Sequence, residues 1–594
     1  MPTKGGRPLE ELDGANPKLA RRPPPGWFAS GRANSLRLAA AAVSALALGF
    51  AARFFADGST VPFDLLAFVW APLAGAPVSV SGRLDGLALF AGSLVALACL
   101  VALIVGPIRA DATSIALTFG CLLAVLGVCL AGDLLLLYLL WEALGLLASL
   151  AARHGISATA GQPKAAEVGR GFVMGHVTGY ALLAAVFLLS RGSGGGFGIV
   201  SVTVDALAGA VPGLLLVAAL GRFSLAWANS GRGRDSLADV RAIMLAVSAA
   251  YLLVRGLGLA DGVLAGRWGL AYQLVGIICL IVGALSVSDL ATRELADRFP
   301  SRMAWIDAGF LFVGIGVGGA PGAMAALMAT ANLALARLPA IVARPPTVEA
   351  EPDSALAISV GADVTAATLV GLPPFLGFAT RVALAAALVG AGAWLTLAVL
   401  VITSAAVARA WLVNVAARWF VDDLPLPVVS GHWNLGLAIA ISPALVAVLA
   451  PGLLAQAAEP VVSIFGGAET VAVLGRVSAG GGWPAWGWAL LAVVLGVIWG
   501  LASPPRPALR RARAATWSAL GGLPSRPERQ ARPSLYAALV RLRGKVIELA
   551  VRWLERLSVG LGRLLGWTER LEPGRAALLV LGAMIVAIWL AGGA

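Results

Sequence analysis

Apolar stretches long enough to cross a lipid bilayer recur along almost the whole chain. A helix rises about 1.5 Å per residue, so about 20 apolar residues span a hydrocarbon core of roughly 30 Å. The sequence is 59% hydrophobic and only 13% charged, and its mean hydropathy is +0.88, which excludes an ordinary soluble globular protein. The short alternating strands of a membrane β-barrel are not apparent. We therefore predict an all-α polytopic membrane protein, with the lipid bilayer as its surroundings.

The apolar pattern predicts about fourteen transmembrane helices. Two of them share the long region Met303–Ile341. No large soluble insertion separates the predicted spans. The others are Leu36–Phe55, Leu84–Gly106, Thr113–Ala131, Leu134–Leu150, Phe172–Ser190, Val211–Ala228, Leu237–Val254, Ala271–Val287, Ala355–Phe378, Val382–Trp411, Leu435–Leu454, Trp486–Ala502 and Ala576–Leu590.

The residue types argue against several chemistries. All the cysteines lie in apolar stretches without paired spacing, which predicts neither disulfides nor a metal site: Cys99, Cys121, Cys129 and Cys279. Three histidines are too few for a multi-histidine metal centre, and no glycine-rich phosphate loop stands between a strand and a helix. We expect no catalytic residue, metal or cofactor in this chain. The net charge of +13 indicates basic cytoplasmic loops rather than nucleic-acid binding.

Residues 506–575 differ from the rest because they are basic and lack long apolar runs. Within them, apolar residues from Leu535 to Leu564 recur every three to four positions, which is typical of an amphipathic helix. We expect this helix to lie on the membrane surface or along neighbouring helices. Anchoring the last span and binding a partner are both open as its role.

The stretch "LLLLYLLWEALGLLASLAAR" (Leu134–Arg153) places one carboxylate, Glu142, near the middle of a predicted span. An ionisable group at this depth costs several kcal/mol. Glu142 is therefore either half of a structural pair with an arginine or part of an ion path. Other ionisable candidates in or beside spans are Asp85, expected near the interface, and His176, Arg222, Asp239, Arg241 and Arg381.

The stretch "GLPPFLGF" (Gly371–Phe378) contains two consecutive prolines, Pro373 and Pro374. Proline lacks the backbone donor and clashes with the preceding turn, so a helix must break there. Broken helices persist in membranes only where protein or a water-filled cavity satisfies the freed backbone groups. Such breaks often mark ion pathways in transporters.

Three stretches of the sequence resemble the antiporter-like membrane subunits of respiratory NADH:quinone oxidoreductase, of Mrp-type cation/proton antiporters and of membrane-bound hydrogenases. They are Gly82–Phe90, Asp133–Leu150 and Leu369–Leu384. The long C-terminal helix and the extra last span resemble most the subunit L (chain 5) branch. The resemblance covers roughly residues 80 to 420.

The resemblance implies about fourteen core helices with two inverted five-helix repeats and a C-terminal amphipathic lateral helix. The implied organisation is a basic polar tail (1–35), N-terminal transmembrane helices (36–131), a first repeat (132–290), a second repeat (291–454), an additional transmembrane region (455–505), the basic segment with its helix (506–575) and a final transmembrane helix (576–594).

The resemblance also implies a proton pathway. Glu142 matches the family's glutamate, and Arg222 stands at its pathway lysine. The remaining positions are Arg170 and His176, where the family has a lysine and an arginine, Arg241 at a histidine or lysine, and Arg381 at a lysine or glutamate after the proline break.

Departures from the family pattern are as informative as the matches. No lysine occurs between Lys164 and Lys545. Buried lysine can lose its proton, whereas arginine stays charged. Leu327–Leu338, where the family has two histidines and a lysine, offers only Thr330, Asn332 and Arg337. The relay is thus either rebuilt from water and acids or lost.

Several functions remain open. The first is a proton-translocating membrane subunit of a complex I-like redox assembly, with electron transfer and quinone chemistry in other subunits. The second is a structural subunit with a degenerate proton path. The third is a cation/proton antiporter of the Mrp type or a bicarbonate-uptake subunit. All imply other membrane subunits as partners, protons or Na⁺ as cargo, and a multi-pass location in a bacterial cell (inner) membrane.

Overall fold

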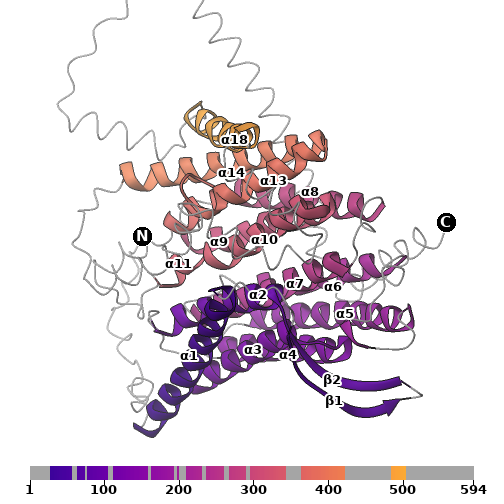
Figure 1. Cartoon of the computed structure of the whole chain (residues 1–594). Coiled ribbons are helices and arrows are strands. Elements are labelled where there is room, and N and C mark those ends of the chain that lie inside the picture. Colours follow the sequence, from indigo (N-terminus) through magenta and orange to yellow (C-terminus); the bar gives the residue numbers. More distant parts are fainter. Residues whose placement is uncertain are drawn as a thin grey trace, which may run out of the picture.

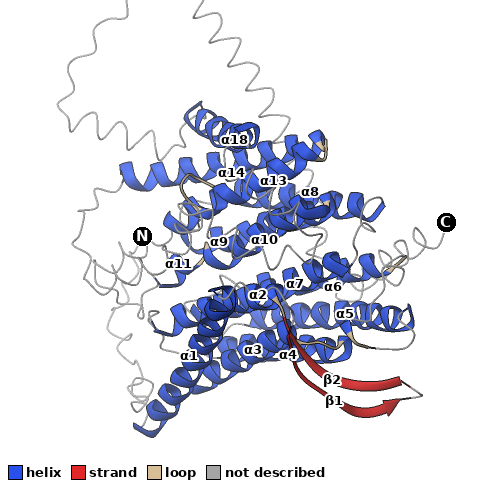
Figure 2. Cartoon of the chain, in the orientation of Figure 1, coloured by secondary structure: helices blue, strands red, loops and turns tan. Residues whose placement is uncertain are grey.

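The computed structural model describes residues 27–56, 63–73, 76–104, 111–157, 162–192, 197–199, 209–229, 236–259, 267–288, 295–342, 363–421 and 483–502. Most of these residues are helical (Figure 2). The helices are α1 (Trp27–Ala56), α2 (Gly86–Ile104), α3 (Ala112–Leu130), α4 (Leu134–Ser157), α5 (Gln162–Gly192), α6 (Val211–Asn229), α7 (Ser236–Leu259), α8 (Arg267–Ser288), α9 (Leu295–Val317), α10 (Gly319–Leu335), α11 (Leu338–Val342), α13 (Leu376–Gly390), α14 (Trp394–Val421) and α18 (Trp483–Ala502).

The helices form two packed groups along the chain. Figure 1 shows α1 to α7 in the lower part of the view and α8 to α18 in the upper part. The groups meet where α10 packs against α7 and α2. Buried apolar residues from both groups form one continuous core, so the two sets of helices belong to one body.

Eight described helices are long and apolar enough to cross a membrane. These spans are Ala33–Phe54, Gly86–Ile104, Ala112–Leu130, Leu134–His154, Leu237–Gly256, Trp268–Val287, Pro321–Val342 and Trp394–Leu412, and shorter apolar helices occupy Val211–Ala226, Leu376–Gly390 and Ala485–Trp499. The chain is therefore a multi-pass, mostly helical membrane protein. The predicted spans Leu435–Leu454 and Ala576–Leu590 and the whole of segment 506–575 lie outside the described residues.

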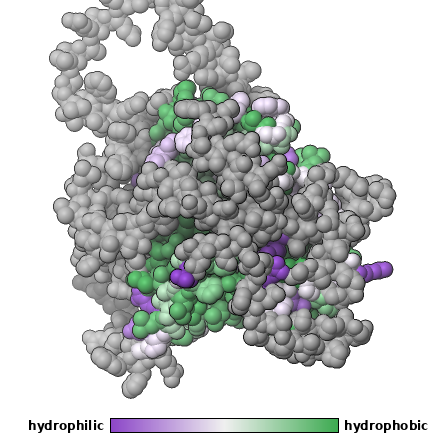
Figure 3. Space-filling view, viewed as in Figure 1, coloured by the Kyte–Doolittle hydropathy of each residue, from purple (hydrophilic) through white to green (hydrophobic). Residues whose placement is uncertain are grey.

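Large apolar side chains also face outward. Figure 3 shows hydrophobic residues gathered in the lower part of this face, where α1 to α3 lie. On α8, Leu270, Leu274 and Ile278 are each more than half exposed and recur every four residues. One stripe of a helix presented in this way is what contact with lipid or with another membrane subunit requires.

A β-hairpin corrects the expectation of a purely helical chain. Strand β1 (Phe63–Leu73) pairs antiparallel with β2 (Ala76–Leu84), and both extend away from the helices (Figures 1 and 2). The segment "APVSVSGRL" alternates apolar and polar residues around Val78 and Val80, and this alternation is the period of a strand. That signal is short and stands between two long apolar runs.

The predicted span Val382–Trp411 is also wrong, because two helices cover this region. Helix α13 ends at Gly390 and α14 begins at Trp394. Gly392 between them has φ +66°, a conformation that glycine adopts without steric cost. The turn therefore divides one long apolar run into two helices.

Acidic residues fix the starts of α2, α3 and α4. Asp111 accepts a hydrogen bond from the Ser114 amide at 3.1 Å and pairs with His154 at the far end of α4 at 2.6 Å. Asp133 caps α4 by accepting from the Leu135 amide at 2.8 Å. Each carboxylate satisfies an amide that a helix start leaves without a partner.

Asp85 directly precedes α2, and there it lies in a buried ion pair. It is 3% exposed and makes a bidentate pair with Arg255 of α7 at 2.5 and 2.8 Å. Burial acts to raise the pKa of Asp85, but the hydrogen bonds and charge of Arg255 outweigh it and hold that pKa below its usual value. The pair joins the start of α2 to α7.

Candidate functional site

The mid-span carboxylate of Glu142 on α4 meets an imidazole from α5. Its Oε2 lies 2.6 Å from Nδ1 of His176. The side chains are 20% and 33% exposed, respectively, so the pair is only partly enclosed by the described residues. A carboxylate and an imidazole this close share a hydrogen-bonded proton, and the tautomer decides which atom donates. The pair brings together two groups that can both gain and lose protons.

The second oxygen of the carboxylate, Oε1, has no donor. It is buried and lacks a hydrogen-bond partner among the described residues. Gly179 on α5 faces it, and a side chain there would overlap Oε1. Since a buried acceptor without a partner is costly, the site calls for a water molecule or a proton at Oε1.

Arg222 from α6 lies beside the same turn of α4. It is 2% exposed, its Nη2 donates to the carbonyl oxygen of Trp141 at 2.6 Å, and its guanidinium stacks 4.2 Å from the Trp141 ring centroid. A side chain at Gly145, one turn beyond Glu142, would overlap the guanidinium. No ion pair joins Arg222 to Glu142 within the described part of the chain, so Arg222 acts on the acid through space.

The other predicted pathway residues are more scattered. Arg241 on α7 is 2% exposed and donates to Oγ1 of Thr118 on α3 at 2.9 Å. Arg222 and Arg241 both lie within electrostatic reach of Cys121 on α3. The backbone of Arg170 lies in α5, but its side chain is outside the described residues.

Pro373 and Pro374 lie in a helix break. Residues 363–370 are helical, and α13 begins at Leu376. Gly371, with φ +83°, ends the first helix, and its amide donates to the Ala367 carbonyl at 3.1 Å. A left-handed glycine after the last turn is a common helix ending.

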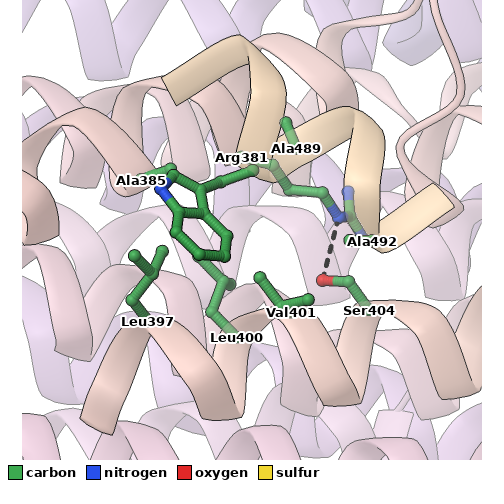
Figure 4. Close-up of a pocket in the computed structure, with 9 residues that line it drawn as sticks. Arg381, Ala385, Leu397, Leu400, Val401, Ser404, Ala489 and Ala492 are labelled. Carbon is green, nitrogen blue, oxygen red and sulfur yellow. Dashed lines mark hydrogen bonds between the residues drawn. The ribbon is translucent and has the colours of Figure 1, made fainter. Parts of the chain in front are cut away.

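The guanidinium of Arg381 bridges the two sides of this break. Its Nη2 donates to the Leu369 carbonyl and its Nη1 to the Gly377 carbonyl, both at 2.9 Å. Its Nε donates to Oγ of Ser404 on α14 at 3.2 Å (Figure 4). The adjoining pocket between α13, α14 and α18 leaves about 10 Å³ for a water centre, room for about one molecule.

A buried acid in the upper group of helices, Asp307 on α9, is missing from the sequence prediction. It is 0% exposed, and its oxygens accept from Asn332 at 2.9 Å and from Arg337 at 2.8 Å. Its signal is the same as that of Glu142, one acid in an apolar run, "MAWIDAGFLFVG". Asn332 and Arg337 could be nominated from the sequence, but the carboxylate that they bind was not.

The structure therefore divides the predicted pathway between two places. Glu142, His176 and Arg222 come together on α4, α5 and α6, and Arg241 lies one helix away. Arg381 and the proline break belong to the upper group of helices (Figure 1), near Asp307 rather than Glu142. No described contact links Arg381 directly to Glu142.

These features describe a helical membrane bundle with charged residues in its apolar helices and a helix broken at two prolines. No protein-family model matches the sequence, and no curated protein matches it. Solved structures do share its fold. A chain of the Mrp complex from Dietzia sp. DQ12-45-1b is similar at a TM-score of 0.59 and 21% identity, over 88% of this chain and 62% of that chain.

A second similar structure is the membrane-bound sulfane sulfur reductase, an archaeal respiratory membrane complex. It matches at a TM-score of 0.53 and 18% identity, over 70% of this chain and 73% of that chain. Our chain thus spans about 62% of the Mrp chain and 73% of the reductase chain. The resemblance inferred from three sequence stretches is confirmed at the level of the fold.

Proposed function

We propose that this chain is a proton-translocating membrane subunit of a complex I-like redox assembly, and that Glu142 with His176 is its proton-exchange site. The observation that carries the proposal is the 2.6 Å contact between the carboxylate of Glu142, which lies inside a span, and the imidazole of His176, with a buried carboxylate oxygen that lacks a donor among the described residues. The likeness to a respiratory membrane complex supports the redox setting. Electron transfer and quinone chemistry would belong to other subunits.

In this mechanism the proton moves between Oε1 or Oε2 of Glu142 and the imidazole of His176. A proton arriving from water at Oε1 neutralises the carboxylate and weakens its attraction for His176. The pair then releases one proton on the other side, and the carboxylate returns to its charged form. Both groups titrate without leaving the hydrogen bond, because each can donate or accept.

Arg222 supplies a fixed positive charge in this scheme. Arginine does not lose its proton under protein conditions, so Arg222 cannot pass one on. Its guanidinium lies beside the same turn of α4 as Glu142, and any movement of α6 relative to α4 would change the electrostatic field at the carboxylate. Partner subunits that move α6 could thereby couple their own reaction to proton release.

The test is proton uptake by the assembly purified with this chain from its native membrane and reconstituted in vesicles. Glu142→Gln keeps the size of the side chain but removes its charge, and we expect it to abolish uptake during turnover. Asp111→Asn is the matched control, since it removes a carboxylate outside the spans and should leave uptake intact. Unchanged pumping in Glu142→Gln, with normal assembly, would overturn the proposal.

A second candidate is a cation/proton antiporter subunit, and the likeness to an Mrp complex favours it. The two functions differ in what drives transport. An antiporter exchanges protons for Na⁺ without electron transfer, so a pH gradient alone should drive ²²Na⁺ uptake into vesicles. Mass spectrometry of the co-purified subunits provides an independent discriminator. A location in a bacterial inner membrane, and membership of the subunit L branch, belong to the same proposal.

A further inference from the structure

The start of helix α6, in the lower group, is held by two aromatic side chains of α8, in the upper group. The indole N–H of Trp268 donates to the Gly209 carbonyl at 2.8 Å. The hydroxyl of Tyr272, which is 2% exposed, donates to the Pro212 carbonyl, also at 2.8 Å. A side chain at Gly213 would overlap the Trp268 ring, so this ring lies directly on the backbone of α6. Specific bonds therefore join the two groups of helices at this point.

A second contact between the groups lies next to Arg222 on α6. The ring of the following residue, Phe223, meets Phe312 of α9 edge to face, with the ring centroids 5.8 Å apart. The centroid of the Phe312 ring lies 6.4 Å from that of Tyr272. The rings of Phe223 and Phe312 are both 0% exposed. Tyr272 is thus connected to α6 twice, by its hydroxyl at the start of the helix and through Phe312 beside Arg222.

Helices α8 and α9 pack closely enough to move as one unit. A side chain at Gly276 or Gly283 of α8, or at Gly309 of α9, would overlap the facing helix. Glycines let helix backbones approach closely in membranes, and interfaces packed at this density transmit displacement rather than absorb it. A displacement of the α8–α9 pair would therefore reach both of its contacts with α6 together.

Helix α6 also contacts the two helices that form the proton-exchange site. A side chain at Gly221 would overlap Thr178 of α5, the helix that carries the imidazole. Arg222 donates to the carbonyl of Trp141 on α4 at 2.6 Å, and Trp141 directly precedes Glu142. Helix α6 therefore connects the site in the lower group to the α8–α9 pair in the upper group.

We propose that Tyr272 is a positioning residue: together with Phe312 it sets the place of α6, and thereby the place of the Arg222 guanidinium relative to Glu142. A movement of the α8–α9 pair would in this way change the electrostatic field at a carboxylate in the other group of helices. The inference rests on the proposed function in taking Glu142 as the site of proton exchange. The placement of Arg222 by Tyr272 can be measured separately from transport.

Infrared spectroscopy of the full chain in lipid nanodiscs makes this measurement. The carboxylate band of Glu142 is isolated by labelling glutamate with ¹³C and subtracting the spectrum of the same variant carrying Glu142→Gln. Tyr272→Phe keeps the ring and removes only the hydroxyl that bonds α6. We expect it to shift the band, because the band frequency follows the local electrostatic field. Ser286→Ala is the matched control and should leave the band in place, since the Ser286 hydroxyl near the other end of α8 donates within its own helix, to the Gly283 carbonyl.

The same measurement in an Arg222→Gln background shows whether the effect passes through the guanidinium. Removing the Tyr272 hydroxyl should no longer shift the band there, because no guanidinium remains to be displaced. An equal shift in that background would mean that Tyr272 acts on α4 by another route, and the proposal would be wrong. An unshifted band in Tyr272→Phe alone, or an equal shift in Ser286→Ala, would also refute it.

Hydrogen exchange at the start of α6 tests whether the Tyr272 hydroxyl holds this helix. The amide of Leu214 donates to the Ala210 carbonyl at 3.0 Å, in the same turn as Pro212. Loss of one ordinary hydrogen bond should make local opening easier, so this amide should exchange about fivefold faster in Tyr272→Phe. Unchanged exchange would contradict the proposal. If Glu142→Gln pumped protons normally while both expected changes were seen, the proposed function would fail but the placement of Arg222 by Tyr272 would stand.

Discussion

Glu142 in the lower group of helices and Asp307 in the upper group are both carboxylates on helices of the bundle, but their surroundings are opposite. Glu142 is 20% exposed and hydrogen-bonds a histidine, and one of its oxygens has no donor in the part of the chain that the structure describes. Asp307 is 0% exposed, and both its oxygens are bonded, one to an arginine. The first acid therefore has a partner that can exchange protons, whereas the second is hydrogen-bonded by an amide and a guanidinium.

The comparison shows that a charge inside a span does not by itself indicate an ion path. Whether the hydrogen-bond partner of the acid can itself exchange a proton decides the role of the acid. An imidazole can take or give a proton near neutral pH, but a guanidinium cannot. Four predictions test this difference between the two acids, from the largest expected effect to the smallest.

The largest effect is expected on transport when the partner of Glu142 loses its titratable group. His176→Gln can still hydrogen-bond the carboxylate but cannot carry a proton, so proton uptake should slow by about 10²–10⁴-fold, the usual contribution of a general acid or base. Uptake rates in reconstituted vesicles measure it. If the rate changed less than about twofold, Glu142 would not depend on a titratable partner, and the proposed difference between Glu142 and Asp307 would be wrong.

The next effect is on stability and separates two arginines. Arg337→Gln leaves Asp307 buried without its cation and should lower the free energy of unfolding by about 3–5 kcal/mol. Arg222→Gln loses a ring contact and one hydrogen bond, with Glu142 free to take up a proton, and should cost only about 1–2 kcal/mol. Denaturation in mixed micelles gives both values. Equal losses would show that the two acids are equally fixed.

A smaller effect is expected at the hydrogen bond that links α11 to the helix before the proline break. Thr365→Val keeps the shape of the side chain but removes the oxygen that accepts from Ala340. One lost hydrogen bond should cost about 1 kcal/mol. Thr368→Val is the matched control, because the hydroxyl of Thr368 donates within its own helix, to the Val364 carbonyl at 2.8 Å. A loss as large at Thr368 would argue against the link.

The smallest effect concerns an acid outside the spans that resembles neither site. Burial raises the pKa of Asp133, and hydrogen bonds from Leu136 and Leu135 only partly oppose it. The folded state therefore binds the proton more tightly than the unfolded state, so stability falls as pH rises from the unfolded pKa through the folded pKa. The slope cannot exceed about 1.4 kcal/mol per pH unit. Unfolding measured against pH should lose this slope in Asp133→Asn, which retains the helix cap.

The sequence predicted the class of fold well because apolar length is a local signal. Most described helices fall where hydropathy placed them, and the break falls at Pro373 and Pro374. The β-hairpin was missed because the alternation around Val78 is only a few residues long. The turn at Gly392 was missed because an apolar run does not reveal where one helix ends and the next begins.

Individual site residues could be nominated from the sequence, but their pairing could not. Glu142 and His176 are 34 positions apart, and no periodicity connects residues on different helices. Asp307 was not predicted, because the resemblance points to basic residues within Leu327–Leu338 and not to an acid on α9. Looking for every acid in an apolar run would have found it, although not its partner Arg337.

Gly179 gives the proton-exchange site a particular vulnerability. The space that Oε1 of Glu142 occupies exists only because this position of α5 has no side chain. The carboxylate therefore occupies space that a methyl group at position 179 would fill. Even the smallest enlargement, Gly179→Ala, would force the carboxylate to move. The absence of a side chain at Gly179 thus determines whether Glu142 on α4 can stay close enough to His176 on α5 to exchange a proton with it.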